Sequence, residues 1–211
     1  MVFATLVTAP PEFPGVACGE LAAVVAVAWC GPVEEGERVL APLRRGCPPV
    51  VDLVGPMPYC ALQSMLDQTA PHGWNYYDKL HYLDAVGDDL IDALIAAMET
   101  VPAPQTHIIT GWMGGAVDRV ASGATAFGHR GVAAETWIIG CSGEEPIDAV
   151  RDWVRRLWDD TAPFARPGTY VNALDAGSSV RDAYAAEVWE RLVAFKRRVD
   201  PDGVFSGNGI G

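Results

Sequence analysis

The segment that most constrains the fold is residues 20–30, ELAAVVAVAWC, because it is apolar on both faces of an extended strand. Side chains alternate along a strand, so Leu21 and Val25 share one face while Val24 and Ala26 share the other. A strand that is apolar on both sides is typical of a sheet with cover on both sides. We therefore expect both faces of this strand to be covered, by this chain or by a partner.

Strand-like and helix-like segments alternate along the rest of the chain. Period-two or continuous apolar runs predict strands, and apolar residues three and four positions apart predict helices. Further strands are predicted at 2–8, 50–54, 74–82, 107–112, 116–120 and 132–140, and helices at 34–44, 58–68 and from Gly87, Ser142 and Ser179. This alternation predicts an α+β fold, with an antiparallel β-sheet and helices packed on one face, in a single domain over residues 1–211.

The charge of the chain excludes several classes of partner. Acidic residues outnumber basic ones by 27 to 15, which gives a net charge of −12. Nucleic acid and anionic membrane surfaces both attract basic patches, so neither is an expected partner. The sequence has neither a transmembrane run of about 18 apolar residues nor a recognisable signal peptide. Its five cysteines include no C-x-x-C pair, which is typical of free thiols, and we expect a cytoplasmic protein.

Several catalytic and cofactor motifs are absent from the sequence. It has no Walker or Rossmann glycine pattern to hold phosphates, and no G-x-S-x-G nucleophile elbow. Its four histidines show no i, i+4 pair and no cysteine partner, so no metal site is expected.

The last forty-odd residues, 168–210, contain the most informative pattern. Tyr170 to Asn172 is a β-prone run with two polar side chains on one face. Ser179 is a candidate helix cap, and the helix after it ends at Asp200-Pro201. Its apolar stripe comprises Tyr184, Val188, Leu192, Phe195 and Val199.

This ending resembles that of the berberine-bridge-enzyme-like FAD-linked oxidases. The shared features are Tyr-x-Asn, a helix with Arg-Leu and Lys, Asp-Pro, and a terminal Asn-x-Ile. Four upstream stretches extend the resemblance over nearly the whole chain: PYCALQSMLD (58–67), GWNYYDKLHYL (73–83), GGAVDRV (114–120) and TAFGHR (125–130). The resemblance implies the C-terminal substrate-binding domain, whose sheet has helices on one face and covers a flavin ring with the other.

The family's flavin-binding domain would precede this region, and we expect no FAD-binding domain within residues 1–211. The chain alone is therefore expected to bind no FAD, which would be held by another domain or a separate chain. A sheet face without its flavin domain should expose apolar residues, and such surfaces usually have partners. We expect a homodimer or a separate flavin-binding chain to cover it, besides a small-molecule substrate.

The resemblance also implies site residues. Tyr170 would take a proton from a substrate hydroxyl while hydride leaves to the flavin, with Lys79 or Arg130 as a cation beside it; otherwise it is a half-buried strand tyrosine. Asn172 would orient a substrate carbonyl or flavin edge, or else make a cross-strand hydrogen bond. Ala173 stands where the family often has an aromatic residue.

Three further residues are candidates for substrate binding. Tyr76 and Lys79 resemble the family's Tyr-Tyr-x-Lys-Ser strand, although Leu80 replaces the serine. Lys79 is either a pocket cation or a solvated lysine at the sheet edge. Trp112 and His107 should lie on opposite faces of their strand, so at most one of them faces the pocket.

A structural role is expected for His129 and Arg130, with Arg130 paired to a carboxylate such as Asp118.

These residues predict the substrate-binding half of a FAD-linked oxidoreductase that acts on a hydroxylated natural product or a sugar-like substrate. The alternative is a flavin-free protein of secondary metabolism, either a binding protein or an enzyme for redox-neutral cyclisation or isomerisation. In both enzymatic cases Tyr170 is the acid–base residue.

Overall fold

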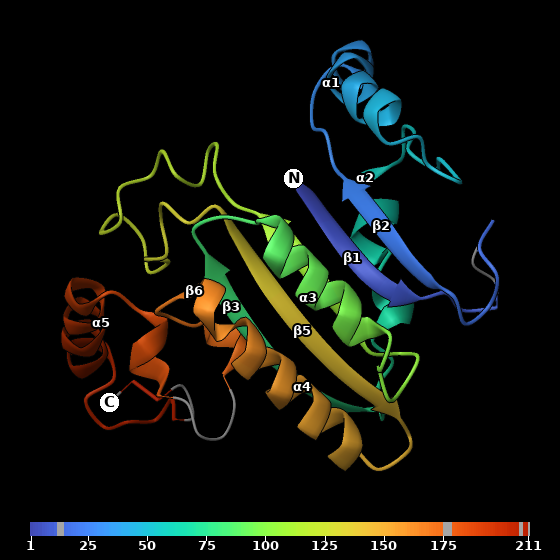
Figure 1. The fold of residues 1–211 in the computed structure, drawn as a ribbon. Helices are drawn as coiled ribbons and strands as arrows, with labels where there is room; N and C mark the ends of the chain where they lie inside the picture. Colours follow the sequence, from blue (N-terminus) through green and yellow to red (C-terminus); the bar gives the residue numbers. More distant parts are fainter. Residues whose placement is uncertain (12–14, 175–178, 207–208, 211) are drawn as a thin grey trace.

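The computed structural model describes residues 1–11, 15–174, 179–206 and 209–210. Within them, six strands form one sheet in the order β2-β1-β4-β5-β3-β6, and neighbouring strands are antiparallel. The predicted α+β fold class is therefore confirmed (Figure 1). The strands are β1 (Val2–Thr8), β2 (Leu21–Val27), β3 (Asn75–Leu83), β4 (His107–Trp112), β5 (Ala134–Gly143) and β6 (Ala165–Arg166).

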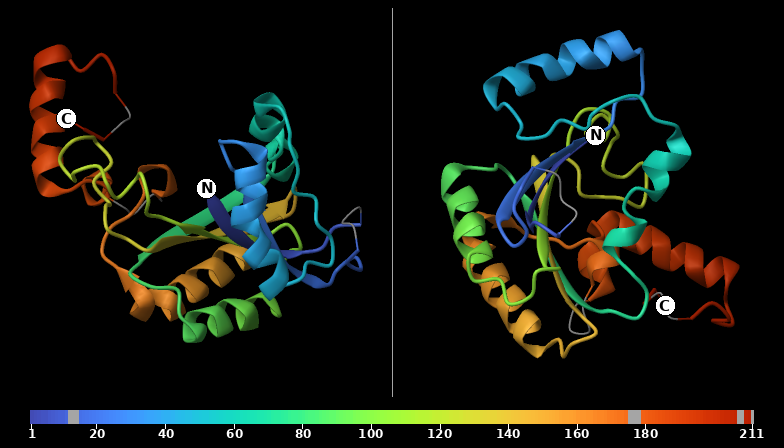
Figure 2. Two further views of the ribbon diagram at one scale, coloured as in Figure 1. Left: turned by 90° about the horizontal axis from the view of Figure 1, so that it is seen from above. Right: turned by 90° about the vertical axis from the view of Figure 1, so that its right-hand side faces the viewer.

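Two of the helices form a layer on one face of the sheet. Figures 1 and 2 show α3 and α4 together on that face, with α5 beyond the β6 end and α1 near the β2 end. The α-helices are α1 (Val33–Gly46), α2 (Tyr59–Ser64), α3 (Asp88–Met98), α4 (Asp148–Thr161) and α5 (Ala186–Val199). Short 3₁₀ turns are η1 (Asp67–Thr69), η2 (Ala162–Phe164), η3 (Val171–Ala173) and η4 (Val180–Ala183). No helix in these described ranges has the length and apolarity needed to cross a membrane.

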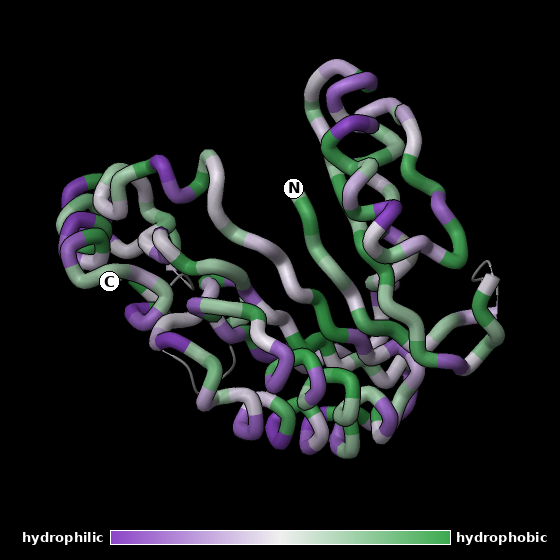
Figure 3. Tube along the Cα trace, turned by 45° about the horizontal axis from the view of Figure 1, so that its top comes forward, coloured by the Kyte–Doolittle hydropathy of each residue, from purple (hydrophilic) through white to green (hydrophobic). Residues whose placement is uncertain are grey.

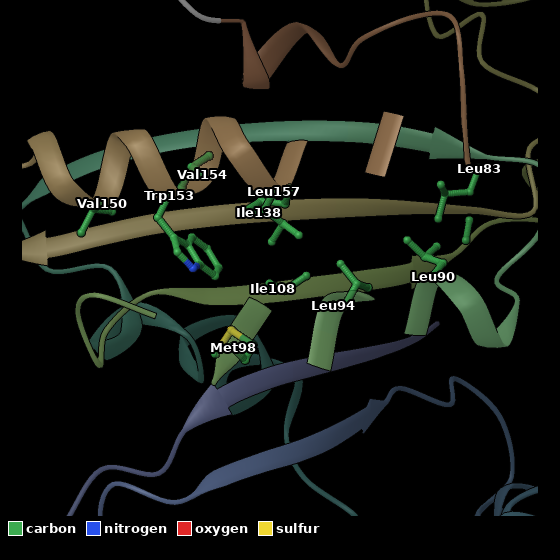
Figure 4. Close-up of a cluster of buried hydrophobic side chains, with 11 residues drawn as sticks. Leu83, Leu90, Leu94, Met98, Ile108, Ile138, Val150, Trp153, Val154 and Leu157 are labelled. Atoms are coloured by element: carbon green, nitrogen blue, oxygen red, sulfur yellow. The ribbon is translucent and has the colours of Figure 1, made fainter. Parts of the chain in front are cut away.

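The main core lies between this helix layer and strands β3, β4 and β5 (Figure 4). The leucines of α3 and the apolar stripe of α4 recur every three or four residues, so each helix presents one apolar face to the sheet. The buried members are Leu83, Leu90, Leu94, Met98, Ile108, Ala134, Ile138, Val150, Trp153, Val154 and Leu157.

Gly140 sets the distance between α4 and the sheet. A β-carbon built on this residue of β5 would lie 2.6 Å from Cγ1 of Val150 and 2.7 Å from Cγ2 of Val154. It would also lie 2.8 Å from the backbone oxygen of Tyr77. Only glycine therefore lets α4 pack this closely against β3 and β5.

The opposite face of the sheet, which we call the open face, is defined by strand register. Because side chains alternate, residues paired across strands share a face. The open face comprises Ala22, Val24 and Ala26 of β2, Phe3, Thr5 and Val7 of β1, His107, Ile109 and Gly111 of β4, Glu135, Trp137, Ile139 and Cys141 of β5, and Tyr76, Asp78, Leu80 and Tyr82 of β3.

The helix layer does not extend over β2. Leu21 and Val25 face the helix side but remain 40% and 45% exposed. Figure 3 shows β1, which begins at the N label, as a largely hydrophobic segment next to this strand. The described residues thus leave this side of β2 without the cover that its sequence leads us to expect.

Several predicted elements differ from the observed ones. Residues 50–54 and 116–120 form bends and turns rather than strands, and the expected helix from Ser179 is divided into η4 and α5. Ser179 does cap η4, because its hydroxyl accepts a hydrogen bond from the backbone N–H of Arg181. Ser142 lies within β5, and Ile147 precedes α4 instead. In residues 50–54 and 116–120 local β-propensity was not enough to form strands, because neither segment pairs with a strand of the described sheet.

We expect Gly140→Ala to lower the free energy of unfolding by about 1–3 kcal/mol, because the added methyl group overpacks the interface with α4. Urea unfolding would measure the change. Gly55→Ala is the matched control, because a β-carbon there meets nothing within 4 Å. Equal unfolding midpoints for the two variants would contradict the role of Gly140.

His81 predicts a pH dependence of stability. It is 5% exposed, its ring stacks on Trp158 at 4.9 Å, and its Nε2 lies 2.8 Å from the carbonyl oxygen of Trp158. Burial lowers the pKa of His81 below its usual value, so the folded chain excludes a proton that the unfolded chain binds. We expect stability to fall as pH drops through about 6.5, the ordinary histidine pKa.

Unfolding measured from about pH 7 to pH 5 should show this loss, and His81→Gln should reduce the slope. The exposed His72 offers the control His72→Gln, which should keep the wild-type slope. An unchanged slope in His81→Gln would rule out His81 as its source.

Candidate functional site

Tyr170 reaches the open face because Gly168 allows the chain to turn tightly against His129. Gly168 has φ of +125°, and a β-carbon there would lie 2.5 Å from Cε1 of His129. The half-buried ring of Tyr170 then packs edge-on against Trp137, with centroids 6.1 Å apart. Tyr170 is thus held against the β3–β5 part of the open face.

Asn172 interacts directly with Tyr170. Its Nδ2 donates a hydrogen bond of 2.8 Å to the phenol oxygen of Tyr170. The segment is not the strand predicted from its sequence, because the N–H of Ala173 donates to the carbonyl oxygen of Tyr170 and closes the 3₁₀ turn η3. The two polar side chains nevertheless meet, and a tight turn brings them together.

The Tyr170 ring packs against an apolar cluster on this part of the open face. Trp137 is also fixed by polar contact, since its Nε1 donates a hydrogen bond of 2.6 Å to Oδ2 of Asp78. Ala173 is buried in this cluster, so a small residue fits where the resemblance suggests an aromatic one. The cluster comprises Leu80, Tyr82, Val132 and Ala173, with Met113, Trp137 and Tyr170 packed against it.

Tyr82 is fully buried beside this cluster. Its ring stacks on His129 with centroids 4.3 Å apart, and Nε2 of His129 lies 3.1 Å from the carbonyl oxygen of Ala183. The buried hydroxyl of Tyr82 has no hydrogen-bond partner among the described residues. Burial raises the pKa of Tyr82, and the nearby Glu135 and Tyr170 add to the effect.

Glu135 is the carboxylate next to Tyr82 on the open face. It pairs with Tyr82 of β3 on one side and with Gly111 of β4 on the other. A β-carbon built on Gly111 would lie 3.5 Å from Oε1 of Glu135, an ordinary van der Waals contact, so the carboxylate lies directly over this residue of β4. Burial raises the pKa of the Glu135 carboxyl group.

The other predicted site residues lie apart from this group. Tyr76 is on the open face but six residues from Tyr82 along β3, and its hydroxyl donates to the carbonyl oxygen of Pro71. Lys79 lies on the helix face, with Nζ 4.6 Å from the ring centroid of Trp158. The sheet therefore separates Lys79 from Tyr170.

Trp112 also lies on the helix face, opposite Ala134, whereas His107 pairs with Ile139 on the open face. The prediction that these two side chains occupy opposite faces is confirmed. Trp112 is exposed at the end of β4 and is not brought next to Tyr170 on the open face.

His129 and Arg130 occupy a structural network, as expected, but the predicted ion pair of Arg130 with Asp118 is not formed. Arg130 donates to the carbonyl oxygen of Val117 and to the hydroxyl of Thr125. Asp118 instead accepts a hydrogen bond from the N–H of Gly131. In the described part of the chain no group of three or more potential metal ligands comes together.

Sequence reasoning identified Tyr170 and Asn172 but missed four neighbours on the open face. Their roles depend on strand register, which the sequence alone does not supply. One signal was present: Glu135 is the only charged residue in an apolar strand, residues 132–140. The missed residues are Asp78, Tyr82, Glu135 and Trp137.

Comparison with known proteins places this geometry in context. No family model matches the chain. An FAD-linked oxidoreductase of Dictyostelium discoideum is 25% identical over 190 residues, which are 88% of this chain and 41% of that protein. The chain therefore spans less than half the length of this relative.

Solved structures share the fold. A BBE-like protein, number 28 of Arabidopsis thaliana, matches with a TM-score of 0.75 and 19% identity, over 99% of this chain and 49% of that one. Berberine bridge enzyme of Eschscholzia californica matches with a TM-score of 0.74 and 16% identity, over 99% of this chain and 48% of that one. The resemblance to berberine-bridge-enzyme-like FAD-linked oxidoreductases is thus confirmed, and it covers about half of each solved protein.

We expect Tyr82→Phe to change the free energy of unfolding by less than about 1 kcal/mol, because the deleted hydroxyl has no partner to lose. Thr136→Val is the control, because the buried hydroxyl of Thr136 lies 3.1 Å from that of Thr110 and its loss leaves a buried group unpaired. This control should cost about 1–3 kcal/mol. Equal losses in urea unfolding would show that the Tyr82 hydroxyl is paired, for instance to ordered water.

Proposed function

We propose that this chain forms the substrate-binding half of a FAD-linked oxidoreductase, with the reaction on its open face. The observation that carries this proposal is the Tyr170–Asn172 hydrogen bond, held against Trp137 on that face. The similarity to FAD-linked oxidoreductases supports the reaction class, and the polar groups beside an apolar surface support a substrate there.

In this proposal Tyr170 accepts the proton of a substrate hydroxyl. The hydrogen bond that Asn172 donates to the phenol oxygen is the contact that an anionic oxygen needs at that position. The half-buried ring of Trp137 provides the apolar surface on which a substrate ring rests. A bound flavin would accept the hydride that leaves the carbon bearing this hydroxyl, so that the alcohol becomes a carbonyl.

The open face fits a flat flavin ring better than a whole dinucleotide. Its central side chains, Ile109, Trp137 and Ile139, are half-buried and apolar, and they form a surface suited to a planar ring. The sequence contains no glycine-rich phosphate motif. We infer that the phosphates are held outside this sheet, by another domain or a separate chain that covers the open face.

A homodimer through the open face is the other arrangement that would cover these residues. The two arrangements are distinguished by recording sedimentation and visible flavin absorption for the purified chain with added FAD, and then for the chain mixed with a candidate flavin-binding chain. A dimer without bound flavin favours the flavin-free alternative. Association with a flavin-binding chain favours the oxidoreductase.

The mechanism predicts that Tyr170→Phe lowers kcat by about 10²–10⁴ with a smaller effect on KM, because the phenol oxygen acts on the proton in transfer. Dye reduction with a panel of hydroxylated aromatics and sugars would measure this, in the complete flavin-containing assembly. Tyr59→Phe is the control, since its hydroxyl bonds to Gln63 on the exposed helix α2. Turnover unchanged in Tyr170→Phe would remove this residue from the mechanism.

A further inference from the structure

The two edges of the sheet differ in the residues that discourage further strand pairing. β3 carries Asp78, Lys79 and His81 along the part of its outer side that does not pair with β6. β2 has neither a charged residue nor a proline in Leu21–Val27, and its register with β1 is regular throughout. Charges, prolines and bulges keep edge strands from pairing, so β2 lacks the features that would prevent it from accepting another strand.

The direction of the backbone groups of β2 follows from its hydrogen bonds to β1. Ala28, just after β2, exchanges two hydrogen bonds of 3.0 Å with Met1, and the N–H of Ala9 donates to the carbonyl oxygen of Glu20. Residues of an antiparallel strand alternate between bonding to one neighbour and pointing to the other side. The even-numbered residues of β2 therefore bond to β1, and the four odd-numbered residues of Leu21–Val27 direct their backbone N–H and C=O groups outward. No further strand of the described sheet pairs with them there.

The sequence of β2 is self-complementary in one antiparallel register that uses all seven residues. In this register Val24 meets its own copy on a two-fold axis, Leu21 faces the partner's Val27, and Ala23 faces the partner's Val25. The facing odd-numbered residues all direct their backbone groups toward each other, so about eight hydrogen bonds join the two strands. A two-fold axis is also the commonest symmetry of protein dimers.

The side chains of β2 fit the same register. On the helix face, Leu21 and Val25 lie beside apolar residues of the second copy, which removes part of their exposed surface from water. On the open face, only the small Ala22 and Ala26 flank Val24 along the strand. Close approach of the two strands therefore meets apolar surface on one face and small side chains on the other.

The charges near β2 are also compatible with this pairing. Glu20 is the charged residue nearest to β2 in the sequence, and it faces the partner's Ala28. Like charges therefore do not oppose each other across the two strands. One strand supplies both halves of a complementary pair, which favours a second copy of this chain as the occupant of the edge. Each chain carries a net charge of −12, so added salt should screen the overall repulsion and strengthen the pair.

We propose that two copies of this chain associate through β2 in this register, which joins their sheets into one continuous antiparallel sheet. The contact lies at the opposite end of the strand order from β6 (Figure 1). Tyr170 packs against Trp137 of β5, three strands away from β2 in that order. The contact is therefore separate from the candidate site, and the inference goes beyond the proposed function without depending on it.

Sedimentation velocity of the full chain, from about 1 to 100 μM, tests the association. We expect a reversible monomer–dimer equilibrium that shifts toward dimer as salt rises. Ala23→Pro removes an outward N–H and places a ring in the contact, while the neighbouring residues keep their bonds to β1, so it should weaken the dimer about tenfold or more. Ala23→Ser is the matched control, because it keeps the N–H and should dimerise as the wild type does.

A cysteine cross-link tests the register. The exposed cysteines outside β2 are first replaced by serine, at Cys18, Cys30, Cys47 and Cys60. Val24→Cys then brings two thiols together, because facing residues that exchange no hydrogen bonds have Cα atoms about 4.5 Å apart, within disulfide range. Ala22→Cys is the matched control on the same face, because its two copies would lie four residues out of register, on the order of 13 Å apart. Mild oxidation should yield a disulfide-linked dimer of Val24→Cys but not of Ala22→Cys.

A chain that stays monomeric over this concentration range would overturn the proposal. So would a dimer that survives Ala23→Pro at wild-type strength, which is the result expected of a homodimer through the open face. Equal cross-linking of Val24→Cys and Ala22→Cys would also overturn it, and this comparison holds even if Ala23→Pro fails to fold. None of these measurements involves flavin or turnover, so their failure is separate from that of the proposed function.

Discussion

The close packing of α4 on the sheet at Gly140 is the contact on which the rest of the structure depends. It fixes the face of β3 and β5 that receives the helices, and strand alternation then assigns every other side chain to the open face. A shift of one residue in either strand would exchange the two sets. The position of Glu135 and Trp137 on the open face is therefore a consequence of packing on the opposite one.

Much of this arrangement could be predicted from local pattern. The strands at 2–8 and 107–112 and the helix after Gly87 have clear periodicities, and the structure confirms them. Residues 170–172 are also β-prone, but Tyr170 is extended and the 3₁₀ turn η3 begins directly after it, because Gly168 turns the chain and β6 ends after two residues. Pairing partners decide such segments, and a single sequence does not reveal partners.

The candidate site, too, could be predicted only in part from the sequence. Tyr170 and Asn172 were found because they lie in one short motif, and they meet through a contact two residues apart. The Asp78–Trp137 bond joins residues 59 positions apart, and no local pattern encodes it. Lys79 shows the opposite case. The motif predicted its strand correctly, but the structure places its side chain on the helix face, against Trp158. Site chemistry built across strands thus becomes visible only once register is known.

The two ends of the sheet differ in a way that bears on solubility. At one end β6 pairs with only two residues of β3, whereas at the other end the seven residues of β2 have no further strand partner within the described sheet. Its exposed Leu21 and Val25 add apolar surface to that edge. Long apolar edges recruit further strands, so whatever shields β2 also protects the protein from intermolecular β-sheet aggregation.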